Sequence, residues 1–126
     1  MSAIAGPLPV SWVRQSPVFN TSGDDQSPNM AVDLNGNSYV CYQTVGTVSG
    51  GSNLGSIDIV VFKLDPTGTV LWTSQRPVFN TSDNDRDPRL VVDQAGNSYV
   101  CYRTNGGTVS GGSNLNTSAS MQKFVL

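Results

Sequence analysis

Hydrophobic residues along this 126-residue chain occur in short runs, separated by polar stretches rich in Gly, Pro, Asn and Ser. Such runs, rich in Val, Thr, Ile and Tyr and bounded by turn-forming residues, are typical of β-strands. In Tyr39–Tyr42 and Ile59–Phe62 every position is apolar, which predicts a sheet covered on both faces. The strands expected in the first half are Asn29–Asp33, Ser38–Thr44, Ile57–Asp65 and Val70–Gln75.

The two halves of the chain are copies of one another. The strings PVFNTS and GNSYVCY each occur twice, 60 residues apart. Aligning Trp12–Leu54 with Trp72–Leu115, with Gly107 treated as an insertion, leaves 29 of 43 positions identical. A repeat of this length indicates two copies of one structural unit, each of which needs neighbours to bury its faces.

Three turns share one pattern, an Asp followed three residues later by Gly, at DLNGN, DPTGT and DQAGN. The Asp side chain can accept hydrogen bonds from backbone amides ahead of it, and Gly supplies a positive φ. Asp33, Asp65 and Asp93 could instead be read as catalytic carboxylates. Their recurrence in unrelated hairpins favours the turn interpretation.

The order of strands within the repeat is circularly permuted. Val10–Gln15 matches Val70–Gln75, the outermost strand of the first unit, and the second unit has no such strand of its own. We therefore divide the chain into an N-terminal extension (1–9), an outer closing strand (10–15), a first blade (16–75) and a second blade without its outer strand (76–126).

Two blades are too few for a closed β-propeller, which needs about 4–8. We expect an all-β chain of two four-stranded antiparallel blades that completes a six- or eight-bladed propeller by homo-oligomerisation, with a homotrimer preferred over a homotetramer. The closing strand of one chain would complete the last blade of the next. The residues expected at that junction are Val10, Trp12, Val13, Phe124 and Leu126.

The segments Asn20–Thr44 and Asp58–Trp72 resemble the bacterial "seven-bladed β-propeller" repeat family. That family has a Gly-Asp-Asp loop, an apolar-Ala-Val-Asp strand, a Gly-Asn-aliphatic-Tyr-Val strand and a Lys-Leu-Asp-x-x-Gly hairpin that ends in Trp, and the two segments follow this pattern closely. The second copy departs from this pattern at Asp83–Asp87, where DNDRD replaces the Gly-Asp-Asp loop. The resemblance implies the fold and a binding or scaffolding role, and it carries over no catalytic residue.

Composition excludes several function classes. The net charge is −2 and only 13% of residues are charged, so no basic patch predicts nucleic-acid binding, and no apolar stretch is long enough to span a membrane. The chain has no His to act as general base, so we expect no enzyme and no cofactor. Residues 1–9 show no secretory signal.

Cys41 and Cys101 occupy the same place in the two repeats. We expect two equivalent buried thiols, too far apart for a disulfide and too few for a zinc site. Free thiols favour a reducing compartment.

Function, if it involves a ligand, is expected on the long loops at one end of the blades. These are the entry loops, Ser16–Pro28 and Arg76–Pro88, and the glycine loops, Val45–Ser56 and Asn105–Thr117. The candidate residues there are Asn20, Thr21, Ser22, Asp24, Asp25, Ser49, Gly50, Gly51, Ser52, Asn53, Asn80, Thr81, Ser82, Asp83, Asp85, Ser110, Gly111, Gly112, Ser113 and Asn114.

Two ligand hypotheses for these loops are disfavoured. Asp83, Asp85 and Asp87 alternate as in a calcium loop, but only one of the three carboxylates recurs in the first copy, so no metal is expected. The glycine loops lack the Gly-Lys-Ser/Thr sequence of a phosphate-binding loop.

We therefore expect a non-enzymatic, self-assembling scaffold whose partner is itself. The alternative is a ring that binds a glycan or protein through the long loops. A third hypothesis is a glycoside-processing enzyme that uses loop Asp residues.

Overall fold

The computed structural model describes residues 6, 9–109, 111, 112 and 120–126, and it describes residues 120–125 by their backbone alone. The described chain contains strands and no helix, which confirms the all-β prediction. No described segment could cross a bilayer as an apolar helix. The strands are β1 (Asp25–Val32), β2 (Ser38–Thr44), β3 (Asp58–Leu64), β4 (Val70–Ser74), β5 (Asp85–Val92), β6 (Ser98–Thr104) and β7 (Ser120–Val125).

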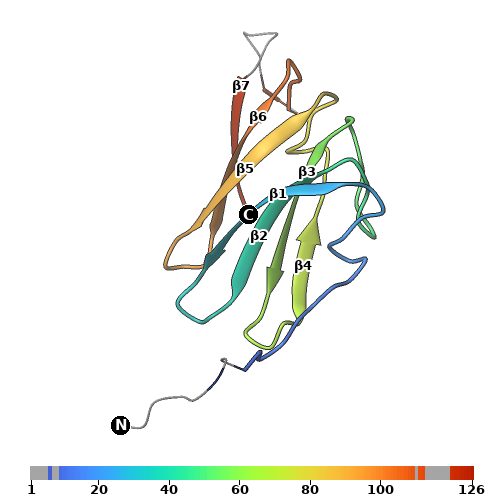
Figure 1. The fold of residues 1–126 in the computed structure, drawn as a ribbon. Helices are drawn as coiled ribbons and strands as arrows, with labels where there is room; N and C mark the ends of the chain where they lie inside the picture. The colour runs from blue at the N-terminus through green and yellow to red at the C-terminus, as the bar shows by residue number, and fades with distance from the viewer. Residues whose placement is uncertain (1–5, 7–8, 110, 113–119) are drawn as a thin grey trace.

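The strands form two antiparallel sheets (Figure 1). Sheet 1 has the order β1-β2-β3-β4, and sheet 2 has the order β5-β6-β7. Each sheet is a meander, because strands that are consecutive in the sequence are neighbours in the sheet. Short turns join β1 to β2, β3 to β4 and β5 to β6, whereas the longer glycine loops join β2 to β3 and β6 to β7. In the β1–β2 turn, the Asp33 carboxylate accepts hydrogen bonds from the amides of Asn35 (2.9 Å) and Asn37 (3.0 Å), and Gly36 has φ +81°. The Asp-x-x-Gly segments are therefore turns, as predicted.

The first strand of each sheet begins earlier than the sequence predicts. Asn29–Asp33 was the expected strand, but β1 starts at Asp25. Asp25 and Gln26 already pair with β2, ahead of a shift in register between Gln26 and Asn29. Ser27 sits in this bulge with φ +55°, and Asp87 has the same φ in β5. A bulge interrupts the pairing of two strands for one or two residues, after which the pairing resumes. The residues before this bulge are polar and resemble a loop in the sequence, so the sequence does not reveal that they pair.

The two sheets pack face to face with β1 and β5 side by side (Figure 1). We call the face of sheet 1 that carries Tyr39 and Cys41, and the face of sheet 2 that carries Tyr99 and Cys101, the front face. The opposite side, with Val40 and Tyr42 or Val100 and Tyr102, is the back face. The front face of sheet 1 packs against the back face of sheet 2, in a core that contains Tyr39, Cys41, Ile59, Val61, Leu90, Val100 and Tyr102.

A second core lies on the back face of sheet 1. Phe19 from the first entry loop and Val48 from the glycine loop cover Tyr42, Val60 and Phe62. The rings of Phe19 and Phe62 stack with centroids 4.5 Å apart. Burial on both faces is thus confirmed for β3 of sheet 1, whereas β6 of sheet 2 alternates between buried and half-buried positions.

Val10–Gln15, predicted as an outer closing strand, forms no strand with the described residues of its own chain. It runs past the β3–β4 turn, where the Trp12 indole N–H donates to the Pro66 carbonyl (2.9 Å) and Arg14 donates to the Gly68 carbonyl (2.9 Å). The Trp12 ring lies over Gly68 so closely that a Cβ there would come within 2.7 Å of it. Pairing with a neighbouring chain stays a prediction.

Candidate functional site at the loops and sheet faces

Asn80, in the second entry loop, holds the two sheets together. Its side-chain oxygen accepts from the Ile59 amide (2.7 Å), and its side-chain nitrogen donates to the Ile59 carbonyl (2.9 Å). The β3–β4 register begins at Val61, so Ile59 lies beyond the end of β4. The carboxamide of Asn80, which is 1% exposed, therefore acts like the peptide group of an added strand.

Thr81 and Asp85 form a closed hydrogen-bonded unit in the same loop. The amide and hydroxyl of Thr81 donate to the two carboxylate oxygens of Asp85 (2.7 and 2.8 Å). Burial raises the pKa of Asp85, and hydrogen bonds from Thr81 oppose that rise. Thr21 and Asp25 repeat this arrangement at 3.0 and 2.8 Å, in an exposed setting. These residues stabilise their loops and do not present free ligand groups.

Gln75, which the sequence did not single out, positions the first glycine loop. Its side-chain oxygen accepts from the Val48 amide (3.0 Å), and its nitrogen donates to the Gly46 carbonyl (3.0 Å). Asn53 also donates to the Val45 and Gly46 carbonyls, at 3.1 and 3.2 Å. The sequence does not mark Gln75, because it follows two other polar residues, Thr73 and Ser74, at the end of the predicted strand.

The remaining candidates lie on the surface at the loop end of the sheets. Ser110, Ser113 and Asn114 lie outside the described residues. The exposed loop candidates are Ser22, Asp24, Ser49, Gly50, Ser52, Ser82, Asp83, Gly111 and Gly112, whereas Gly51 is half-buried. Their hydroxyls and amides could bind a polar ligand, but they present no nucleophile–base pair.

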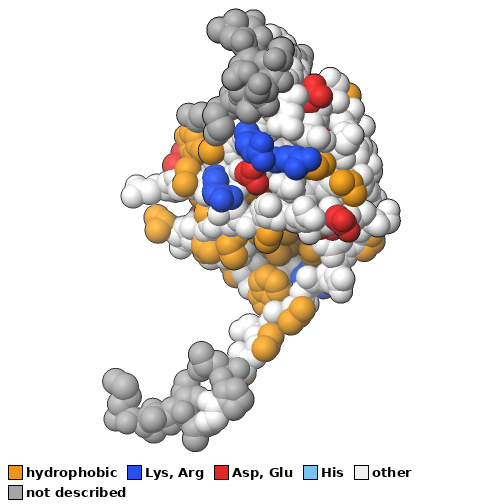
Figure 2. All heavy atoms as spheres, turned by 45° about the horizontal axis from the view of Figure 1, so that its top comes forward, with side chains coloured by type: hydrophobic (Ala, Val, Ile, Leu, Met, Phe, Trp, Pro, Cys, Tyr) orange, Lys and Arg blue, Asp and Glu red, His pale blue; other side chains and the backbone are white. Residues whose placement is uncertain are grey.

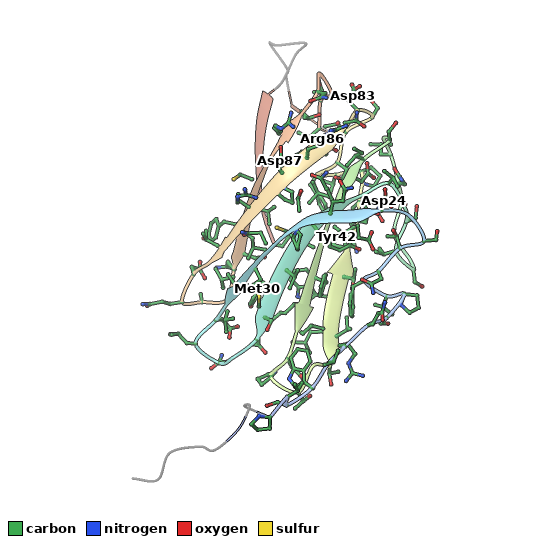
Figure 3. All side chains as sticks on the ribbon, viewed as in Figure 1. Asp24, Met30, Tyr42, Asp83, Arg86 and Asp87 are labelled. Atoms are coloured by element: carbon green, nitrogen blue, oxygen red, sulfur yellow. The ribbon has the colours of Figure 1, made fainter. Side chains whose placement is uncertain are left out.

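The acidic residues of the second entry loop lie apart from one another and have different partners. Asp83 and Asp87 lie at separate points along the loop and β5 (Figure 3). Asp85 binds Thr81, and Asp87 forms an ion pair with Arg103 at 2.5 Å. Among the described residues no three His, Cys, Asp or Glu side chains gather as metal ligands.

An open cleft of about 690 Å³ lies at the first entry loop. Hydroxyls and amides line it, and no charged residue does, so it has no group to act as acid or base. Its lining residues are Gln15, Ser16, Pro17, Asn20, Thr21, Ser22, Thr47 and Ser49.

Polar contacts supplement the apolar packing between the sheets. Asn29 accepts a hydrogen bond from the Leu90 amide (2.9 Å), and Gln43 accepts one from the Asp87 amide (2.8 Å). The Tyr39 hydroxyl lies 3.0 Å from the Gly96 carbonyl oxygen, to which it can donate. With the Asn80 clamp, these bonds give the two sheets one defined relative position.

At the outer sides of the molecule, the β1 part of the sheet 1 back face and the front face of sheet 2 are exposed. On the back face of sheet 1, Met30 is 58% exposed, although Leu90, its counterpart in the repeat, is buried between the sheets. On the front face of sheet 2, Val91 is 64% exposed, and Tyr99 is half-buried, whereas Tyr39 is fully buried. Figure 3 shows Met30 and Tyr42 on neighbouring strands of sheet 1.

Cys101 also lies on the uncovered front face of sheet 2. Both cysteines are free thiols, as expected, but only Cys41 is buried, and Cys101 is half-buried. The expectation of two equivalent buried thiols was therefore wrong for Cys101. The reason is that sheet 2 covers the front face of sheet 1, and nothing in the described chain covers the front face of sheet 2.

Charge distinguishes the uncovered front face from the covered one. The places of Asn29 and Gln43 are taken in sheet 2 by Arg89 and Arg103. Basic side chains gather on one side of the molecule, next to an acidic one (Figure 2).

Of the residues expected at the junction between chains, Val10 and Val13 are strongly exposed and Trp12 and Leu126 are partly exposed. The Phe124 side chain lies outside the described part.

Comparison with known proteins gives no assignment. No family model matches the sequence, and no curated protein matches it significantly.

Proposed function

We propose that this chain is a non-enzymatic subunit of a self-assembling β-propeller, with a structural or scaffolding role. The observation that carries the proposal is the pairing of unlike faces: the front face of one sheet covers the back face of the next. Among the described residues, the β1 part of the sheet 1 back face, with Met30 and Val32, and the front face of sheet 2, with Val91, are left exposed. A second copy is the occupant that fits, because its faces are the repeat counterparts of the surfaces that already pack together within one chain.

Such an interface is heterologous, so repeating it produces either a closed ring or a filament. Blades that fan around an axis favour closure, and rings of about 4–8 blades are the stable range. Three chains would supply six blades and four would supply eight, with the trimer preferred. Covering Met30 and Val91 would remove from water two of the most exposed large apolar side chains of sheets 1 and 2.

The N-terminal segment would complete the second sheet of a neighbour. Val10–Gln15 matches Val70–Gln75, which contains β4, and sheet 2 has no fourth strand among the described residues. Trp72 packs edge-on against Tyr39, with ring centroids 6.3 Å apart. Trp12 would make the corresponding contact with Tyr99 of the next chain.

Native mass spectrometry of the purified chain tests the assembly. We expect a single species at three or four times the 13.3 kDa chain mass, and a monomer at micromolar concentration would overturn the proposal. Met30→Asp and Val91→Asp, which place a charge on each of the two exposed surfaces, should each yield folded monomers. Leu34→Asp is the matched control, because Leu34 is exposed in a turn. Deletion of residues 1–15 should abolish the defined ring.

A second candidate function is a ring that binds a glycan or protein, and the polar cleft at the first entry loop favours it. Repeated copies of one weak site on a ring would bind with avidity. Glycan-array binding that is lost on Thr47→Val or Ser49→Ala, with the oligomer intact, would support this function over a purely structural role.

A further inference from the structure

The two Asn-Thr-Ser segments are identical in sequence but differ in their contacts. Asn80 is buried and clamps the backbone of β3 through two hydrogen bonds. Asn20 is half-buried, borders the polar cleft and has no side-chain hydrogen bond with the described residues. Its loop is otherwise built in the same way, because the Asn20 amide donates to Ser16 as the Asn80 amide donates to Arg76. The Asn20 loop therefore has the backbone form of the Asn80 clamp, but the Asn20 carboxamide holds no strand among the described residues of its own chain.

The strand that Asn20 would hold can be identified from the register. Ile59, the residue clamped by Asn80, pairs with Gln43 of β2. In sheet 2 the place of Gln43 is taken by Arg103, which pairs with Met121 of β7. Met121 is thus the backbone position that corresponds to Ile59, and β7 has no further strand beside it among the described residues.

We infer that Asn20 is an assembly residue whose carboxamide binds the Met121 peptide N–H and C=O of a second copy. This inference rests on the proposed self-assembly and assigns it a specific polar contact. The side-chain oxygen accepts from the Met121 amide and the side-chain nitrogen donates to its carbonyl, as Asn80 does at Ile59. The cleft beside Asn20 is then a docking site for a strand of the same protein.

Asn20→Ala tests the contact, and Asn35→Ala is its matched control because the second repeat already has Ala95 at that place. Loss of two hydrogen bonds per interface should raise the dissociation concentration of the oligomer about tenfold or more, with circular dichroism unchanged. Asn35→Ala should leave it unchanged. Asn80→Ala should instead lower the melting temperature of the chain itself, because that clamp lies inside it.

Hydrogen exchange on the unmodified oligomer gives a second measurement. The Met121 amide should be protected in the oligomer and exchange rapidly in Asn20→Ala. An oligomer that forms equally well in Asn20→Ala, or an unprotected Met121 amide in the wild-type oligomer, would overturn the role of Asn20 and leave the assembly standing. A wild-type monomer would overturn the assembly.

Discussion

The side-chain oxygen of Asn29 accepts a hydrogen bond from the backbone amide of Leu90 at 2.9 Å, across the junction of the two sheets. In the second repeat the residue at the place of Asn29 is Arg89, whose side chain has no hydrogen-bond acceptor. A junction between chains would therefore lack the bond that the junction within the chain has. The Met30 amide of the neighbour would face a guanidinium instead.

Arg89→Asn should strengthen assembly, because it restores the side-chain acceptor and removes a charge from the exposed front face of sheet 2. We expect a several-fold lower dissociation concentration, consistent with about 1 kcal/mol for a hydrogen bond. Analytical ultracentrifugation over a dilution series measures it. Arg76→Asn is the control for loss of charge, since Arg76 is exposed in the second entry loop. Weaker assembly of Arg89→Asn would contradict the proposed likeness between the junction inside the chain and the junction between chains.

The two thiols should react at very different rates. Burial raises the pKa of Cys41 to about 12, so almost none of it is thiolate at neutral pH, and it is inaccessible. Cys101 is half-buried on the uncovered front face. A thiol-reactive chromophore at pH 8 should modify one thiol per dilute chain, shown by mass spectrometry to be Cys101. Reaction should slow as concentration rises and a second copy covers that face, whereas concentration-independent rates would argue against coverage.

Gln15 and Gln75 occupy the same place in the repeat but should respond differently to mutation. Gln75→Ala removes two hydrogen bonds from a buried loop and should destabilise the chain by about 1–3 kcal/mol in urea unfolding. Gln15 is exposed, so Gln15→Ala should leave monomer stability unchanged. If Gln15 holds the second glycine loop of a neighbour, the same variant weakens the oligomer.

Turn and core carboxylates should give opposite pH dependences. Hydrogen bonding to Asn97 lowers the pKa of Asp93 below 3.8, so its contribution to stability is present above pH 3.8 and is lost as the pH falls through the folded pKa. Burial raises the pKa of Asp85 above 3.8, so its contribution is present below pH 3.8 and is lost as the pH rises through the folded pKa.

Urea unfolding at pH 3, 5 and 7 distinguishes these effects. Asp93→Asn should reduce the loss of stability between pH 5 and 3, because Asn keeps the turn acceptor without titrating. Asp85→Asn should reduce the loss that accompanies ionisation as the pH rises from 3. The measured quantity is the slope of the free energy of unfolding against pH. A substitution that destabilises the protein equally at every pH leaves this slope unchanged. Unchanged slopes would contradict the assigned pKa directions.

Local features were predictable because they depend on residues that are close in the sequence. The three turns follow from Asp and Gly three residues apart, and β2 (Ser38–Thr44) begins and ends where the apolar run predicts. The start of β1 was missed because its first paired residues, Asp25 and Gln26, are polar and are separated from the rest of the strand by the bulge at Ser27. No local signal separates a loop Asp from Asp25 or Asp85, each of which binds a Thr four residues earlier.

The candidate site was less predictable, because identical segments have different surroundings. The sequence alone determined the all-β class, the two repeats and the turn positions, since backbone preferences and hydrophobic pattern act locally. Only the tertiary structure decided which face of each sheet is covered, and hence why Asn80 is a buried clamp and Asn20 is not. Burial is a property of packing between distant segments, so two copies of one sequence can differ wherever just one of them has a neighbour.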